Sequence, residues 1–183
     1  IPNLNIISTS DSLETIKAVE ASLESEISCY IRLTGGSNNP IINKSDYEFK
    51  IGKSITLKEG KDIIIFSSGA ILSETLLAAN LLKDNGISAK VVNMHTIKPI
   101  DEEMIQNSIQ DFKLIVSVEE HNIIGGLGSA ISETLSKFKG SPALLSLGIN
   151  DTYSKSGSYD FLKDYHGLTH KKILKNILEK LDD

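Results

Sequence analysis

From about residue 60 onwards, short apolar segments alternate with longer segments of helical periodicity. The run at residues 62–67 is continuously apolar, which is typical of a strand buried on both faces of a sheet. Further strands are predicted at 88–93, 113–118 and 143–147, and helices at about 70–84, 101–111, 128–138 and from Thr169 onwards. Such alternation predicts an α/β fold: a mostly parallel, doubly wound sheet between two helical layers, in a three-layer α/β/α arrangement.

A single β-α-β unit is predicted before this region. Residues 4–8 and 27–33 have the apolar character of strands, and Asp11 and Glu14 have the spacing of a helix capping box between them. One unit of this kind cannot cover both faces of its own strands, so we expect it to pack against further protein. The sequence also opens directly in a strand segment without an initiator methionine, which is typical of a piece of a longer chain.

Turn-forming residues at 35–40 mark the boundary between these two regions. We therefore expect a partial unit at 1–36, a connector at 37–57 and a complete domain at 58–183. The connector includes a possible edge strand at 54–58, where apolar and polar residues alternate weakly.

Composition and charge exclude several classes of partner. The net charge is −5, and no basic run interleaves with aromatic residues, which argues against nucleic-acid binding. No apolar run approaches the roughly 18 residues needed to span a bilayer. The single cysteine, Cys29, cannot form an internal disulfide, which favours a reducing compartment such as the cytoplasm.

A glycine-rich turn follows the strand predicted at 113–118. Gly125, Gly126 and Gly128 open the next helix, but a dinucleotide fingerprint needs a third glycine and an acidic residue about 20 positions later. Both are absent, and no Gly-Lys-Ser/Thr follows as in a phosphate-binding P-loop. A structural turn at an interface or domain contact is therefore favoured, with phosphate binding at a helix N-terminus as the alternative.

Glu119, Glu120 and His121 precede this turn and could suggest acid–base chemistry or a metal. Adjacent residues of an extended chain point to opposite faces, so the three side chains do not converge by themselves. The other histidines, His95, His166 and His170, lie far from these three residues in the sequence. We interpret the three residues as fixing a loop or subunit contact, and we assign no catalytic, cofactor-binding or metal-binding residue.

Arg32 lies at the carboxyl end of the strand predicted at 27–33, just before two glycines. An arginine at such a position can bind an anion through two parallel hydrogen bonds. A surface salt bridge is the alternative.

Several motifs together resemble the transketolase family. Residues 94–101, 118–121 and 125–130, with the tail motifs at 148–151, 156–157 and 165–169, resemble its C-terminal domain in order and spacing. Residues 1–3, 10–14 and 30–32 resemble the last β-α-β unit of its pyrimidine-binding domain.

The resemblance implies a thiamine-diphosphate-dependent enzyme that moves a two-carbon ketol unit between sugar phosphates. In that family a Gly-Asp-Gly motif holds the diphosphate through Mg²⁺, and a glutamate of the pyrimidine-binding domain activates the cofactor. This sequence has no Gly-Asp-Gly, and the glutamate would lie before Ile1. Arg32 matches a position that contacts the substrate phosphate in relatives, so it is the predicted substrate-binding residue.

The resemblance further implies that this section is inactive alone, binds no cofactor by itself and forms a homodimer through the C-terminal domain. The N-terminal and pyrimidine-binding domains would come from the same chain or from a complementary subunit. Deoxyxylulose-phosphate synthase and the β subunit of a 2-oxo acid dehydrogenase are alternatives within the enzyme class. A non-catalytic binding or assembly module is the alternative from another class.

Overall fold

The computed structural model describes residues 1–34, 39–42 and 46–183. The domain boundary predicted between residues 36 and 37 lies outside the described residues. In chain order the elements are β1 (Leu4–Ser8), α1 (Ser12–Leu23), β2 (Ser28–Arg32), β3 (Ile55–Lys58), β4 (Ile63–Ser68), α2 (Leu72–Asp84), β5 (Ala89–Asn93), β6 (Thr96–Lys98), α3 (Glu102–Ser108), β7 (Leu114–Asn122), α4 (Leu127–Leu135), β8 (Ala143–Ile149), α5 (Tyr159–Tyr165) and α6 (His170–Asp182).

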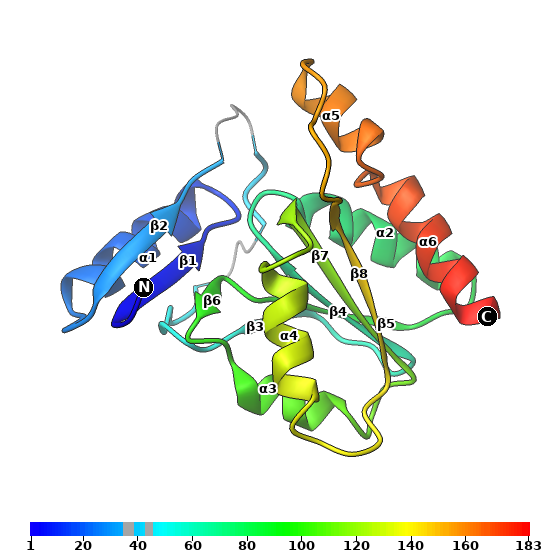
Figure 1. Cartoon of the computed structure of the whole chain (residues 1–183), viewed down its shortest axis with the longest axis horizontal. Coiled ribbons are helices and arrows are strands. Elements are labelled where there is room, and N and C mark those ends of the chain that lie inside the picture. The colour runs from blue at the N-terminus through cyan, green and yellow to red at the C-terminus, as the bar shows by residue number, and fades with distance from the viewer. Residues whose placement is uncertain (35–38, 43–45) are drawn as a thin grey trace.

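The larger sheet has the strand order β3-β5-β4-β7-β8. Four of its strands are parallel to their neighbours, and β3 runs antiparallel to β5 at one edge. Helices α2 and α6 pack on one face, and α3 and α4 pack on the other (Figure 1). The predicted three-layer, doubly wound arrangement is therefore confirmed.

Strand β4 shows why its sequence is apolar throughout. Ile63 and Ile65 pack into the core under α2 and α6, whereas Ile64 and Phe66 pack into the core under α3 and α4. All four side chains have no solvent exposure. Successive side chains of a strand point to opposite faces of the sheet. A central strand with a hydrophobic layer on each face therefore needs apolar residues at every position, which gives a continuous apolar run instead of an alternating one.

A second, smaller sheet has the order β2-β1-β6. Strands β1 and β2 are parallel, as expected of a β-α-β unit, but β6 pairs with β1 antiparallel through Ile6↔Lys98 and Ile7↔Thr96. The sequence did not predict β6, which belongs to a later part of the chain. The N-terminal unit is therefore joined to the following domain by a shared sheet, in addition to the connector.

Helix α1 begins with the predicted cap, shifted slightly in register. The Asp11 carboxylate accepts a hydrogen bond from the backbone N–H of Glu14 at 2.9 Å. The Glu14 carboxylate returns to the N–H of Ser10 at 2.7 Å instead of to Asp11 itself. It also accepts hydrogen bonds from Asn93 of β5 at 2.6 Å and from the Tyr47 hydroxyl at 3.3 Å. A capping residue of the N-terminal unit thus also bonds to the main domain.

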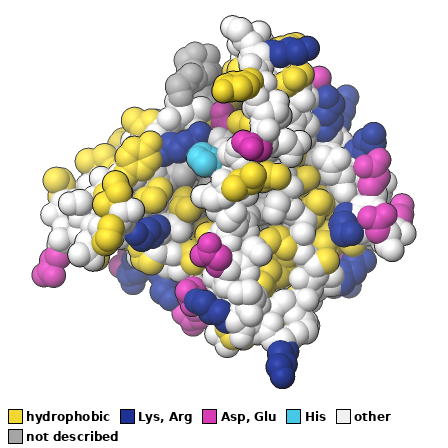
Figure 2. All heavy atoms as spheres, viewed as in Figure 1, with side chains coloured by type: hydrophobic (Ala, Val, Ile, Leu, Met, Phe, Trp, Pro, Cys, Tyr) yellow, Lys and Arg dark blue, Asp and Glu magenta, His cyan; other side chains and the backbone are white. Residues whose placement is uncertain are grey.

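The N-terminal unit keeps an apolar outer surface. On α1, Ile16, Val19 and Leu23 are exposed, and so are Tyr30 and Leu33 at and beyond β2. Hydrophobic side chains gather over this unit in the view of Figure 2. Exposed apolar side chains gathered on one unit indicate that this unit contacts other protein.

Candidate functional site

Arg32 is the last residue of β2, and its side chain reaches across to the main domain. Its Nη2 donates a hydrogen bond to the backbone carbonyl of Glu120 at 2.8 Å. It is the only arginine in the sequence. The residue predicted to bind substrate therefore lies at the junction of the two sheets.

A cavity of about 240 Å³ opens at this junction. Its walls come from the N-terminal sheet, from the carboxyl ends of β4 and β7, and from the turn into α4. The lining residues are Ile6, Ser8, Tyr30, Arg32, Ser68, Ile97, Glu119, Glu120, His121, Gly125, Gly126 and Leu127. All the predicted site residues except Gly128 are thus brought to one cavity, which is bounded by Arg32 on one side and by the glycine turn on the other.

The end of β7 departs from a regular ladder, which the sequence did not reveal. Strands β7 and β8 pair through Val118↔Leu147 and again through Asn122↔Ile149. Residues 119–121 of β7 therefore lie opposite the single residue Gly148 of β8. Bulges of this kind re-aim side chains and are common next to functional sites.

Glu119 points from this bulge toward α4 and is 2% exposed. Its carboxylate accepts hydrogen bonds from the N–H groups of Leu127 at 2.7 Å and Gly128 at 2.8 Å. Burial raises the pKa of this carboxyl, and the two N–H donors oppose that shift. The N-cap residue Gly126 has no side chain to satisfy these donors, so Glu119 caps the helix from the neighbouring strand. The N–H groups that a phosphate would use are already bonded.

The glycines of the turn make this close approach possible. A Cβ on Gly126 would collide with the carboxylate of Glu119, and one on Gly128 would lie 2.7 Å from the Ser146 hydroxyl. Gly125 has φ +77°, a left-handed conformation that favours glycine. The turn therefore packs directly on the end of β7.

Glu120 points to the other side of the sheet, as alternation along a strand predicts. Its carboxylate accepts a hydrogen bond from the Tyr159 hydroxyl at 3.0 Å, while its carbonyl accepts the one from Arg32. Burial raises the pKa of the Glu120 carboxyl, and the Tyr159 hydrogen bond and the charge of Arg32 oppose this. Tyr159 was not predicted as a site residue, because it lies in a sequence segment rich in Gly, Ser, Asp and Tyr that resembled a loop.

The histidines do not form a common site. His121 is exposed at the cavity, and its Nδ1 lies 3.0 Å from the carbonyl oxygen of Asn122. His95 is fully buried and stacks on Phe49 with ring centroids 4.0 Å apart. Within residues 1–34, 39–42 and 46–183, no three His, Cys, Asp or Glu side chains lie together as a metal site.

No helix of the described part is long and apolar enough to cross a membrane.

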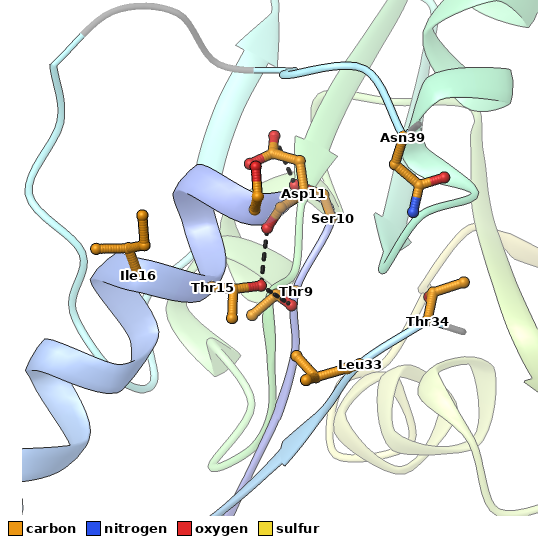
Figure 3. Close-up of a pocket in the computed structure, with 9 residues that line it drawn as sticks. Thr9, Ser10, Asp11, Thr15, Ile16, Leu33, Thr34 and Asn39 are labelled. Carbon is orange, nitrogen blue, oxygen red and sulfur yellow. Dashed lines mark hydrogen bonds between the residues drawn. The ribbon is translucent and has the colours of Figure 1, made fainter. Parts of the chain in front are cut away.

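A larger hollow of about 490 Å³ lies beside the N-terminus of α1 (Figure 3). The hydroxyls of Thr9 and Thr15 point toward each other there and lie 2.8 Å apart. The Asp11 carboxylate is bonded to the N–H groups of Glu14 and Ile42. The lining residues are Thr9, Ser10, Asp11, Ser12, Thr15, Ile16, Leu33, Thr34 and Asn39, with no cationic side chain among them. Among the described residues, the hollow offers hydrogen bonds but no positive charge, so the Arg32 cavity is the stronger anion site.

Comparisons with known proteins agree on one family. Residues 52–173 match the family described as "Transketolase, C-terminal domain". The chain is 40% identical over 182 residues to a protein of Methanocaldococcus jannaschii named "Putative transketolase C-terminal section", covering 99% of this chain and 57% of the relative. It is 34% identical to a 1-deoxy-D-xylulose-5-phosphate synthase of Caldanaerobacter subterraneus, covering 98% of this chain and 29% of that enzyme.

A solved structure titled "Split gene transketolase, inactive beta4 tetramer" superposes with a TM-score of 0.89 at 35% identity. The match covers 98% of this chain and 57% of that one. The chain therefore spans little more than half the length of the M. jannaschii relative and of this structure.

Proposed function

This chain belongs to the transketolase family through its C-terminal domain, and we propose that it is the C-terminal section of a thiamine-diphosphate-dependent transferase. The complete enzyme moves a two-carbon ketol unit between sugar phosphates. In this section, residues 1–36 are the end of the pyrimidine-binding domain, 37–57 are the connector and 58–183 are the C-terminal domain. The exposed apolar side chains of α1 support this division, because the rest of a pyrimidine-binding domain would cover them.

The position of Arg32 at the cavity between the two sheets is the observation that carries the proposal. A guanidinium has five N–H donors, and the hydrogen bond to Glu120 uses one of them, so others can bind a phosphate bidentately. The guanidinium borders a cavity large enough to admit a phosphate group. In this proposal Arg32 binds the phosphate of the sugar, and Glu119, Glu120, His121 and the glycine turn form the structural support of the cavity.

The described residues do not fit the cofactor. The Glu119 carboxylate is bonded to α4 and that of Glu120 to Tyr159, so neither is placed as a ligand of Mg²⁺. No other group of three acidic, His or Cys side chains lies together among the residues that the structure describes. We therefore assign thiamine diphosphate and Mg²⁺ to the parts of the enzyme outside this section.

The proposal includes assembly with further protein. The solved neighbour is a split-gene transketolase whose β chains alone form an inactive tetramer. By analogy, this chain associates with itself as at least a dimer and becomes active with the N-terminal part of the enzyme. Sedimentation that showed a monomer only, at high protein concentration, would contradict self-association. The single cysteine, Cys29, fits a reducing compartment, so we place the enzyme in the cytoplasm.

The proposed reaction is tested with the complete enzyme and two substrate pairs. Xylulose 5-phosphate with ribose 5-phosphate is expected to give ketol transfer. Pyruvate with glyceraldehyde 3-phosphate tests the synthase reaction that the 34% identical relative suggests. Release of CO₂ from pyruvate without ketol transfer would replace transketolase by deoxyxylulose-phosphate synthase.

The role of Arg32 is tested by the variant Arg32→Gln. It is expected to raise KM for the phosphorylated acceptor at least tenfold, because a charge-assisted bidentate contact is lost. Lys53→Gln removes an exposed cation on the connector and is the matched control. An unchanged KM in Arg32→Gln would refute the assignment of this residue to substrate binding.

A further inference from the structure

The backbone carbonyl of Glu120, which accepts the hydrogen bond from Arg32, lies in the least regular part of β7. The pairing of β4 with β7 ends at Ser68↔Glu119, and the pairing of β7 with β8 is interrupted between Val118 and Asn122. Glu120 therefore lies beyond the regular ladders on both sides. Its backbone position depends on what its side chain and those of its neighbours bond to.

Two carboxylates anchor this bulge on opposite faces of the sheet. Glu119 is bonded to the first turn of α4 through two N–H groups. Glu120 is bonded to the Tyr159 hydroxyl, 39 residues away at the start of α5. The hydrogen bonds of Glu119 fix the glycine turn. The hydrogen bond of Glu120 to Tyr159 is made by the same residue whose backbone carbonyl accepts the hydrogen bond from Arg32.

Tyr159 is itself held firmly by its neighbours. Lys163, one turn later in α5, lies with its Nζ 4.9 Å from the centre of the Tyr159 ring. The same ammonium donates to Glu74 of α2 at 2.8 Å, and Glu74 accepts a hydrogen bond from the N–H of His170 at 2.9 Å. Both side chains of the Lys163–Glu74 pair are largely buried. Helix α5 is thus bonded to α2 and α6, and these contacts fix the position of the Tyr159 hydroxyl.

We propose that Tyr159 is a positioning residue for Arg32, acting through Glu120. The hydroxyl holds the Glu120 carboxylate on the α5 side of the sheet, which fixes the Glu120 carbonyl as the acceptor for the guanidinium. Without the hydroxyl, the carboxylate loses its neutral partner. It is then drawn toward the positive charge of Arg32, because Lys163, the other cation that acts on it, is already paired with Glu74. It then occupies the donors that a substrate phosphate would use. The link to catalysis rests on the proposed function of Arg32, but the structural coupling does not.

The coupling is measured by NMR on the Arg32 Nε–Hε signal. Because Arg32 is the only arginine of these 183 residues, the variant Arg32→Lys identifies the signal without ambiguity. Tyr159→Phe is expected to shift or broaden it. Tyr153→Phe is the matched control, since Tyr153 lies on the loop before α5 and is 101% exposed. A Tyr159→Phe spectrum that superposes on the wild-type signal would overturn the proposal.

A second variant, Glu120→Ala, keeps the proposal testable if Tyr159→Phe fails to fold. Glu120→Ala keeps the backbone carbonyl and removes the carboxylate through which Tyr159 acts. It is expected to perturb the Arg32 signal, and Tyr159→Phe added to it is expected to cause no further change. Additive changes in the double variant would show that Tyr159 acts on Arg32 by another route, against the proposal.

The functional consequence is measured in the complete enzyme. Tyr159→Phe is expected to raise KM for ribose 5-phosphate about fivefold, the effect of one hydrogen bond of ordinary strength. The kcat and the KM for the unphosphorylated acceptor glycolaldehyde are expected to stay unchanged, which a general loss of stability would not produce. If Arg32→Gln raises this KM while Tyr159→Phe changes neither KM nor the NMR signal, only the positioning role fails. If Arg32→Gln has no effect on KM, the assignment of Arg32 to phosphate binding fails, while the structural coupling can still be observed.

Discussion

His95 makes a quantitative prediction about stability at mildly acidic pH. It follows β5, is fully buried and stacks on Phe49, and its Nδ1 lies 3.0 Å from the Thr96 hydroxyl. Its Nε2 has no hydrogen-bond partner among the residues that the structure describes. Burial lowers the pKa of His95 from 6.5 to about 4, although the negative charge of Asp101 opposes the shift.

The sign of the effect follows from which state binds the proton. Between pH 6.5 and pH 4 the unfolded chain is protonated at His95 and the folded chain is not, so stability falls as the pH falls. With these two pKa values, lowering the pH from 7 to 5 costs the folded state about 2 kcal/mol. The buried carboxyls of Glu14, Glu119 and Glu120 have raised pKa values, so they act in the opposite direction, but they are present in any His95 variant as well.

The comparison is therefore made between the wild type and His95→Gln. Urea unfolding at pH 5, 6 and 7 gives the free energy of unfolding of each protein. The variant is less stable at pH 7, because it loses the stack on Phe49, but the gap is expected to narrow by about 2 kcal/mol at pH 5. His121→Gln, which removes an exposed imidazole, is the matched control. A difference in stability that stays constant from pH 7 to pH 5 would contradict the lowered pKa of His95.

Two further predictions concern the glycine turn. Glu119→Ala leaves the N–H groups of Leu127 and Gly128 without their acceptor and is expected to lower the free energy of unfolding by about 2–3 kcal/mol. In thermal melts, the exposed Glu133→Ala on the same helix is its control, and equal effects of the two variants would contradict the capping role. Gly126→Ala places a methyl group against the Glu119 carboxylate and is expected to destabilise the fold by more than about 2 kcal/mol. Gly140→Ala, which has open space around its Cβ and only a left-handed φ of +75°, is expected to cost about 1 kcal/mol, and the reverse order would refute the packing argument.

The central strand of the main sheet and helix α1 could be predicted from the sequence because both are encoded locally. The apolar run of β4 and the cap of α1 at Asp11 depend on neighbouring residues in the chain. Strand β6 could not be predicted in this way, since three residues become a strand only by pairing with β1, about 90 positions earlier. Helix α5 was missed for a related reason: it is short and buries no residue fully, and it is held by the Ser158 cap and by the ion pair of Lys163 with Glu74.

The candidate site likewise has a part that the sequence predicted and a part that it did not. Arg32 and the glycine turn were singled out by residue type and by position at strand ends, which are local signals. The hydrogen bond between Arg32 and Glu120 joins residues 88 positions apart, and the bulge at 119–121 arises from the register of β8. Tyr159 carried no signal in the sequence, because its role depends on the position of α5 over the end of β7.

In the proposed function, this chain supports ketol transfer only as one section of a larger enzyme. The most direct test is an assay of ketol transfer from xylulose 5-phosphate to ribose 5-phosphate, with thiamine diphosphate and Mg²⁺ present throughout. The chain is measured alone and after mixing with the N-terminal and pyrimidine-binding parts of the enzyme. We predict no transfer by the chain alone and transfer in the mixture. Transfer by the chain alone, or none in a mixture shown to have assembled, would contradict the proposed function.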